Sequence, residues 1–173
     1  MTISMSSACL PLFQTTLGNL SHILDKAQAH ADARKFDASA LTQFRLAPDM
    51  LPFTRLVLIA CDAAKNGVAR ISGVEAPKFD DTETTFAELK ERIRKTLDWL
   101  ATVPADKLDG REDKDITFPV GREKTRTMKG QAYLSHWMLP NFFFHVVTAY
   151  AILRHNGVEI GKTDYLVGAA AGA

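Results

Sequence analysis

The chain has 173 residues, of which 46% are hydrophobic and 24% charged, and its formal net charge is +1. This length and composition are those of one globular domain, so we expect residues 1–173 to form a single unit. The near-neutral charge gives no reason to expect a nucleic acid or an acidic membrane surface as a partner. No run of about 18 apolar residues occurs, so no membrane span is expected. The first residues lack the basic start and apolar core of a signal peptide, which predicts a cytoplasmic protein.

The first third of the chain predicts one long helix. Between Leu10 and Leu24 apolar residues recur every three or four positions, a helical period. The helix should run from about residue 4 to residue 31 and either start or bend at Pro11. A short helical turn is expected over residues 39–44.

Two further long helices follow. The second should open at Pro48-Asp49 and run to about Ser72, with Gly73 as its stop, and it is apolar on most sides. The third has the clearest start, because Thr85-Phe86-Ala87-Glu88 reads as a capping box. Its apolar stripe ends before Pro104.

The helical pattern breaks over residues 105–130. Ile116, Phe118 and Val120 alternate with polar residues and Gly121 follows them, which predicts a small β-hairpin or loop. Pro119 places that strand at an edge.

A fourth long helix is expected from about residue 131 to residue 155, bent near Pro140 and ended by Asn156-Gly157. The tail from about 158–159 to 173 reads as extended, with a disordered end. Four long helices with a small excursion between the third and the fourth predict an all-α, antiparallel four-helix bundle.

Three segments together resemble an uncharacterised bacterial family, a domain of unknown function in the DinB/YfiT-like superfamily. They are APDMLPFTRLVLIACDAAK, EAPKFDDTETTFAELKERIRKTLDWL and LPNFFFHVVTAYAILRHNGVEIGKTDYL. The likeness covers nearly the whole chain, and the last segment is the most specific. It implies an up-down-down-up bundle with a cavity between the helices, usually assembled as a homodimer.

Many members of the superfamily bind a divalent metal through three histidines, one on the second helix and two on the fourth. The resemblance places the latter two at Asn141 and His145, of which only His145 is a histidine. The second helix has no histidine, and its polar candidates are Arg55 and Asp62. The resemblance therefore implies a metal site that has lost most of its ligands.

The most informative local feature is a polar stripe on the fourth helix. Asn141, His145 and Thr148 fall within an arc of about 60° on a helix that is otherwise apolar all round. An apolar helix is a buried helix, so these side chains must be hydrogen-bonded internally, bind a ligand or line a wet cavity. His145 is a candidate general base, and a polar ladder that fixes the helix register is the alternative.

Arg55 and Asp62 form a second candidate group, because they lie about 20° apart on the second helix and interrupt an apolar run. They predict a polar pocket floor, with Arg55 as a bidentate donor to an anion, or else a structural ion pair or side chains that extend to the surface. His136, before Pro140, is a candidate for the pocket rim. An aromatic packing role for its neighbourhood is the alternative.

A divalent metal, zinc or nickel, would need three ligands. His145, Asp62 and Asn141 are the candidates, with His136 and Cys61 in reserve, and we expect no resident metal. Cys9 and Cys61 lie on separate predicted helices and are expected to be reduced and buried.

Three functions are compatible with these patterns. The first is a ligand-binding bundle whose metal site is degenerate. The second is a metal-dependent thiol transferase or hydrolase with a rearranged site centred on His145. The third is a non-catalytic interaction protein that works as a homodimer. The first is favoured, with a small molecule as the ligand.

Overall fold

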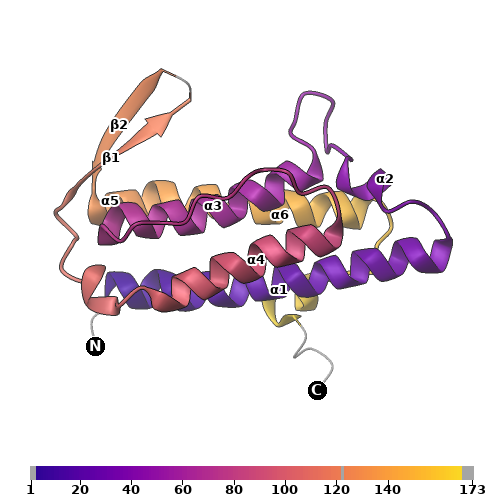
Figure 1. Ribbon diagram of the computed structural model, residues 1–173, viewed down its shortest axis with the longest axis horizontal. Helices are drawn as coiled ribbons and strands as arrows, with labels where there is room; N and C mark the ends of the chain where they lie inside the picture. Colours follow the sequence, from indigo (N-terminus) through magenta and orange to yellow (C-terminus); the bar gives the residue numbers. More distant parts are fainter. Residues whose placement is uncertain (1–2, 122, 169–173) are drawn as a thin grey trace.

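The computed structural model describes residues 3–121 and 123–168. Its four longest helices are α1 (Met5–Arg34), α3 (Phe53–Ser72), α4 (Phe86–Thr102) and α6 (Leu139–His155). In Figure 1, α3 and α6 form one layer and α1 and α4 the other. Shorter helical pieces are α2 (Ser39–Thr42), a 3-10 turn (Ala105–Lys107), α5 (Gly130–Tyr133), a π-helical turn (Leu134–Met138) and α7 (Lys162–Leu166). Within these residues no helix is both long and apolar enough to cross a membrane.

Helices α3 and α4 run parallel to each other. Phe53 and Phe86, their first residues, are in edge-to-face contact with ring centroids 5.8 Å apart, and further along Cys61 lies beside Thr96. The chain must therefore return along α3 before α4 begins, and residues 74–85 do this (Figure 1). The prediction of an antiparallel bundle is wrong for this pair, whereas the up-down-down-up order implied by the resemblance agrees with it.

The length of this connection follows from the helix it must span. The 20 residues of α3 are about 30 Å long. A chain of twelve extended residues reaches about 40 Å, so residues 74–85 (the 74–85 segment) can lie along α3 with little slack. This geometry places the segment over the seam between α3 and α4.

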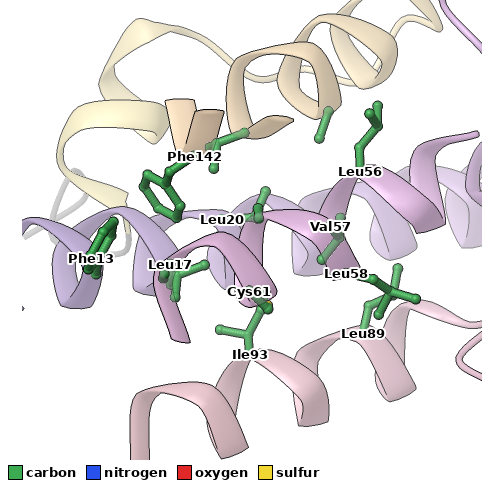
Figure 2. Close-up of a cluster of buried hydrophobic side chains, with 14 of the residues drawn as sticks. Phe13, Leu17, Leu20, Leu56, Val57, Leu58, Cys61, Leu89, Ile93 and Phe142 are labelled. Atoms are coloured by element: carbon green, nitrogen blue, oxygen red, sulfur yellow. The ribbon is translucent and has the colours of Figure 1, made fainter. Parts of the chain in front are cut away.

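The core fills the space between the two layers (Figure 2). Phe13 of α1 and Phe142 of α6 meet edge to face with ring centroids 4.8 Å apart. Each fully buried side chain of this kind stabilises the fold by about 1.5–3 kcal/mol. Cys9 and Cys61 are both buried and free, as predicted. The large buried side chains drawn from the long helices include Leu17, Leu20, Leu56, Leu58, Leu89 and Ile93.

Capping side chains begin α1 and α4. The Ser4 side chain accepts from the backbone of the third helical residue, and Thr85 forms the predicted capping box with Glu88. The start of α4 is therefore confirmed. Helix α1 continues to Arg34, three residues beyond the prediction, and Pro11 lies inside it rather than at its start.

Helix α3 begins at Phe53, not at the predicted Pro48-Asp49. Pro52 is its N-cap in extended conformation, with φ −69° and ψ 159°. A proline disfavours helical backbone at the residue before it, so the helix cannot run through Leu51. Gly73 ends the helix with φ 78°, as predicted.

The predicted hairpin is confirmed. Strands β1 (Asp115–Val120) and β2 (Lys124–Lys129) pair antiparallel, with Asp115 opposite Lys129 and Val120 opposite Lys124. Pro119 is tolerated because both strands of a two-stranded sheet are edges. Figure 1 shows the hairpin projecting from one end of the molecule, next to α5.

The last long helix is continuous from α5 through the π-helical turn into α6. The disturbance expected near Pro140 takes the form of that turn, Leu134–Met138, directly ahead of α6. Pro140 has no N–H to donate to the carbonyl four residues back. Interrupted ladders of this kind are where π turns occur.

The C-terminal tail is not extended throughout, as the sequence predicted, because residues 162–166 form α7. The Gly161 N–H donates to Asp164 Oδ2 at 2.7 Å, which starts the helix. Lys26 of α1 binds the other carboxylate oxygen at 2.9 Å and fixes α7 against α1. The predicted disordered end falls on residues 169–173, outside the described residues.

Candidate functional site

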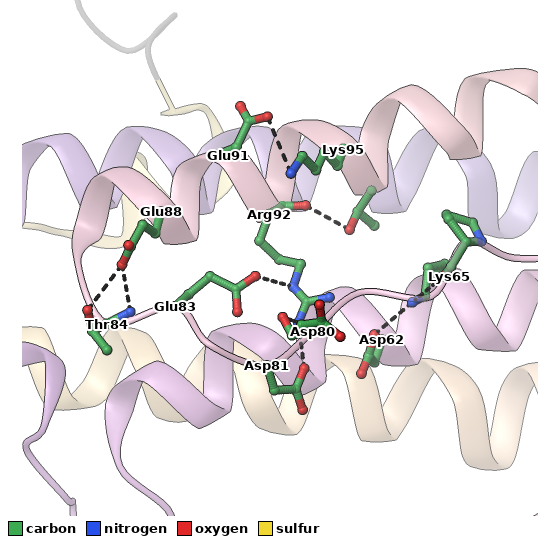
Figure 3. Close-up of polar contacts among 12 residues, drawn as sticks. Asp62, Lys65, Asp80, Asp81, Glu83, Thr84, Glu88, Glu91, Arg92 and Lys95 are labelled. Carbon is green, nitrogen blue, oxygen red and sulfur yellow. Dashed lines mark hydrogen bonds and ion pairs between the residues drawn. The ribbon is translucent and has the colours of Figure 1, made fainter.

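A buried arginine lies at the seam between α4 and the 74–85 segment (Figure 3). Arg92 is 1% exposed. Its Nη2 lies 2.5 Å from Asp81 Oδ1 and donates to the Asp80 carbonyl at 3.3 Å, while its Nε lies 2.8 Å from Glu83 Oε1. A buried guanidinium needs such partners, because an uncompensated charge in a low dielectric costs several kcal/mol.

Asp81 also ties the segment to α3. Its second oxygen, Oδ2, lies 2.7 Å from Arg55 Nη1. Burial raises the pKa of Asp81, but the hydrogen bonds and charges of Arg55 and Arg92 outweigh it and hold that pKa below its ordinary value. The carboxylate is therefore ionised at neutral pH and bridges the two helices.

Phe79 is a second anchor of the segment. Its ring lies beneath two cations, with Lys65 Nζ 4.3 Å and Arg92 Cζ 4.8 Å from the centroid. Lys65 of α3 is buried, donates to the Pro77 carbonyl at 2.9 Å and lies 3.1 Å from Asp62 Oδ1. These contacts hold the middle of the 74–85 segment against both helices.

A cavity of about 600 Å³ opens between α4 and this segment, and we call it the Arg92 cavity. Its segment wall consists of Lys78, Phe79, Asp80, Thr82 and Glu83. Its helix wall consists of Ala87, Glu88, Glu91, Arg92 and Lys95. Three buried atoms of these residues have no hydrogen-bond partner within residues 3–121 and 123–168, namely Glu83 Oε2, Arg92 Nη1 and Arg92 Nε, of which only Nε lies at ion-pair distance from an acid, Glu83.

The polar stripe predicted on α6 has mixed surroundings. Thr148 is buried and its Oγ1 donates to the Phe144 carbonyl at 2.6 Å, so this hydroxyl is satisfied within the helix. His145 is 8% exposed, and its buried Nδ1 has no partner in the part of the chain that the structure describes. Burial lowers the pKa of the imidazole, which is therefore neutral at pH 7. Asn141 is half-buried.

The remaining predicted residues lie elsewhere. Arg55 and Asp62 contact residues that hold the 74–85 segment and not the stripe on α6. His136 is exposed in the π-helical turn, 3.5 Å from Ser135 Oγ, on a shallow pocket of about 230 Å³. The structure therefore does not gather the six predicted residues into one site.

The donor set does not fit a zinc or nickel site. Among the described residues no three His, Cys, Asp or Glu side chains are placed to hold a metal ion. Asp62 is paired with Lys65, and burial raises the pKa of the Cys61 thiol to about 12. These contacts do not favour a metal site formed by His145, Asn141 and Asp62.

Arg92, Phe79 and Glu83 are absent from the residues predicted for a site. A signal for Arg92 does exist, because it follows Leu89 by three residues and lies on the buried side of the α4 stripe. A charged side chain there predicts an internal ion pair. The 74–85 segment has no periodic pattern, so nothing local indicates that Phe79 and Glu83 turn toward that arginine.

Comparison with known proteins identifies the family. A family model described as "Domain of unknown function (DUF1993)" matches residues 5–166. The chain belongs to this family. The crystal structure of a DinB family member protein from Shewanella denitrificans is 42% identical, with a TM-score of 0.84 over 92% of this chain and 89% of that one. The resemblance seen in the sequence is therefore confirmed. No curated protein matches the chain.

Proposed function

We propose that this DUF1993 protein is a DinB-like four-helix bundle that binds a small ligand in the Arg92 cavity without a resident metal. One observation carries the proposal: a fully buried arginine on the cavity wall retains an N–H group that has no partner in the described part of the chain. An unmet buried donor costs about 1–3 kcal/mol, and an acceptor on a ligand recovers part of that cost. The volume of about 600 Å³ suits a small molecule.

The walls of the cavity are held in place before any ligand arrives. Asp81 and Phe79 fasten the segment to Arg92, and Lys65 fastens it to α3. A preformed wall spares the ligand the entropy of ordering a loop. This arrangement supports binding rather than a mobile lid.

The superfamily's metal site is degenerate in this proposal. Only His145 stands at an implied ligand position, and its neighbours do not complete a donor set. A metal-dependent transferase or hydrolase centred on His145 is therefore less well supported than metal-independent binding.

The test is a screen of small polar compounds against the purified protein, followed by ¹H–¹⁵N NMR spectra in the presence of EDTA. Binders should shift the resonances of residues 78–83, and Lys95→Ala should weaken them several-fold. Lys107→Ala, an exposed lysine outside the cavity, is the matched control. Binders that shift only other regions, or that lose affinity in EDTA, contradict the proposal.

A second candidate function rests on the outer face of α6. Phe144 is 57% and Val147 48% exposed there, and the Phe144 ring contacts His145, whose Nδ1 has no partner within residues 3–121 and 123–168. We propose that this face forms the interface of a homodimer. Analytical ultracentrifugation should show a dimer that Phe144→Ser dissociates, whereas Leu46→Ser, an equally apolar exposed position on another segment, should not. A monomeric wild-type protein contradicts this proposal.

A further inference from the structure

The acidic residues of the Arg92 cavity are not equally available to a ligand. Glu88 Oε2 accepts from the backbone N–H groups of Thr84 and Thr85 at 2.8 and 2.9 Å as the cap of α4. Glu91 accepts from Arg94 Nε at 2.8 Å and Nη2 at 2.6 Å. Both carboxylates are therefore committed to groups of the protein.

The cationic groups of the cavity are freer. Lys78 has no ion-pair partner among the described residues, and Lys95 Nζ lies 3.8 Å from a Glu91 oxygen that already binds Arg94. Arg92 adds Nη1, which has no hydrogen-bond partner in the residues that the structure describes. These three positively charged donors, Lys78 on the segment wall and Arg92 and Lys95 on the helix wall, suit a carboxylate in the cavity, because hydrogen bonds between charged groups are about twice as strong as neutral ones.

Two acceptors on the segment wall suit a cation. Glu83 Oε2 is buried without a partner in the described residues. The Asp80 carboxylate forms no ion pair within them, although its carbonyl accepts from Arg92. Figure 3 shows Glu83 and Asp80 next to the Arg92 guanidinium, with Lys95 about one turn further along α4.

We infer that the ligand is a small zwitterion with a carboxylate and an ammonium group, such as a free amino acid, an inference that rests on the proposed function. The carboxylate binds the Lys78, Lys95 and Arg92 donors, and the ammonium group binds Glu83 and Asp80. A ligand of zero net charge supplies partners for Arg92 Nη1 and for Glu83 Oε2, which have none among the described residues. It also leaves the net charge of the ion pairs around Arg92 unchanged. An anion alone leaves Glu83 Oε2 unmet, and a cation alone leaves Arg92 Nη1 unmet.

The experiment titrates the protein with free amino acids, their N-acetyl derivatives and their amides, using calorimetry and NMR. A free amino acid should bind and shift residues 78–83, and removing either charge should lower affinity about tenfold or more. Lys78→Ala should weaken the free and N-acetyl forms alike. Glu83→Gln should weaken only forms with an ammonium group, and exposed Asp80→Asn serves the same purpose if Glu83→Gln does not fold. Lys107→Ala is the control.

Each other outcome overturns the inference in a recognisable way. Equal binding of the N-acetyl form means that the cavity takes an anion, and equal binding of the amide means that it takes a cation. If a screened compound of another class shifts residues 78–83 and no amino acid does, the zwitterion is wrong and the proposed function stands. If nothing binds in the cavity, both are wrong.

Discussion

Arg92 Nη2 of α4 lies 2.5 Å from Oδ1 of Asp81 in the 74–85 segment. This pair joins α4 to the segment that runs back along α3 before α4 begins. Because α3 and α4 are parallel, the crossing has no helix or strand of its own to stabilise it. The ion pairs of Arg92 and the contacts of Phe79 hold the segment in place instead, and the same contacts form part of the wall of the Arg92 cavity.

Arg92→Met should destabilise the protein by about 3–5 kcal/mol, because it leaves the largely buried Glu83 without its counter-charge and leaves Asp81 with Arg55 alone. Chemical denaturation followed by circular dichroism measures the loss. Arg94→Ala is the control on the same helix, since this arginine is exposed and pairs only with exposed acids. Arg94→Ala should stay close to wild type, and equal losses in the two variants would contradict an internal role for Arg92.

Three glycines should respond differently to alanine, because their surroundings differ. Gly18→Ala in α1 should stabilise by about 0.5–1 kcal/mol, since no atom of the described residues lies within 4 Å of the added Cβ. In Gly67→Ala the Cβ would lie 2.2 Å from Met138 Sδ, which predicts a loss of about 1–3 kcal/mol. In Gly130→Ala it would lie 2.0 Å from the Arg111 carbonyl oxygen, where no rotamer gives relief, so this loss should be the largest.

A double variant checks the cause of the Gly67 effect. Met138→Ala should recover part of the loss in Gly67→Ala, because it removes the colliding side chain. Thermal and urea melts of the two single variants and the double variant give the coupling. If the free-energy changes of the two single variants simply add in the double variant, steric contact between residues 67 and 138 is not the explanation.

Local signals account for what could be predicted from the sequence. The capping box at Thr85, the stop at Gly73 and the alternation from Ile116 to Val120 act within one turn or one strand, and each was confirmed. The predicted start of α3 is wrong. Pro48-Asp49 is a strong helix-start signal in the sequence, but the boundary is set four residues later by Pro52.

The candidate site depends on contacts that no local pattern encodes. Arg55 and Asp62 were predicted as either a pocket floor or an ion pair, and both now lie in ion pairs. The ion-pair partners of Arg55 and Asp62 depend on the path of the 74–85 segment. That path in turn depends on the parallel arrangement of α3 and α4. The helical period predicts that Asn141, His145 and Thr148 share one face of α6. It does not indicate which residues pack against that face, so it could not predict what these side chains do.

The two cysteines should be nearly unreactive in the folded protein. Burial raises the pKa of both thiols to about 12, so at pH 8 the thiolate fraction is roughly a thousandfold lower than for a free cysteine. A thiol reagent such as DTNB should label neither Cys9 nor Cys61 until the protein unfolds. Single variants, Cys9→Ala and Cys61→Ala, assign any residual labelling, and rapid labelling of one thiol in native buffer contradicts the burial.

Acidification should test the buried imidazole of His145. Burial lowers its pKa in the folded state, so the unfolded chain takes up a proton near pH 6.5 that the folded chain refuses. Stability is therefore complete above that pH and falls as the pH drops through it, by up to about 1.4 kcal/mol one unit below. Asp81, whose pKa lies below its ordinary value, loses its contribution only in more acidic solution.

Unfolding free energies at pH 7.5 and 5.5 should differ less in His145→Gln than in wild type. Asn141→Ala, on the same stripe and without an ionisable group, should keep the wild-type difference, and an unchanged difference in His145→Gln means that another group titrates.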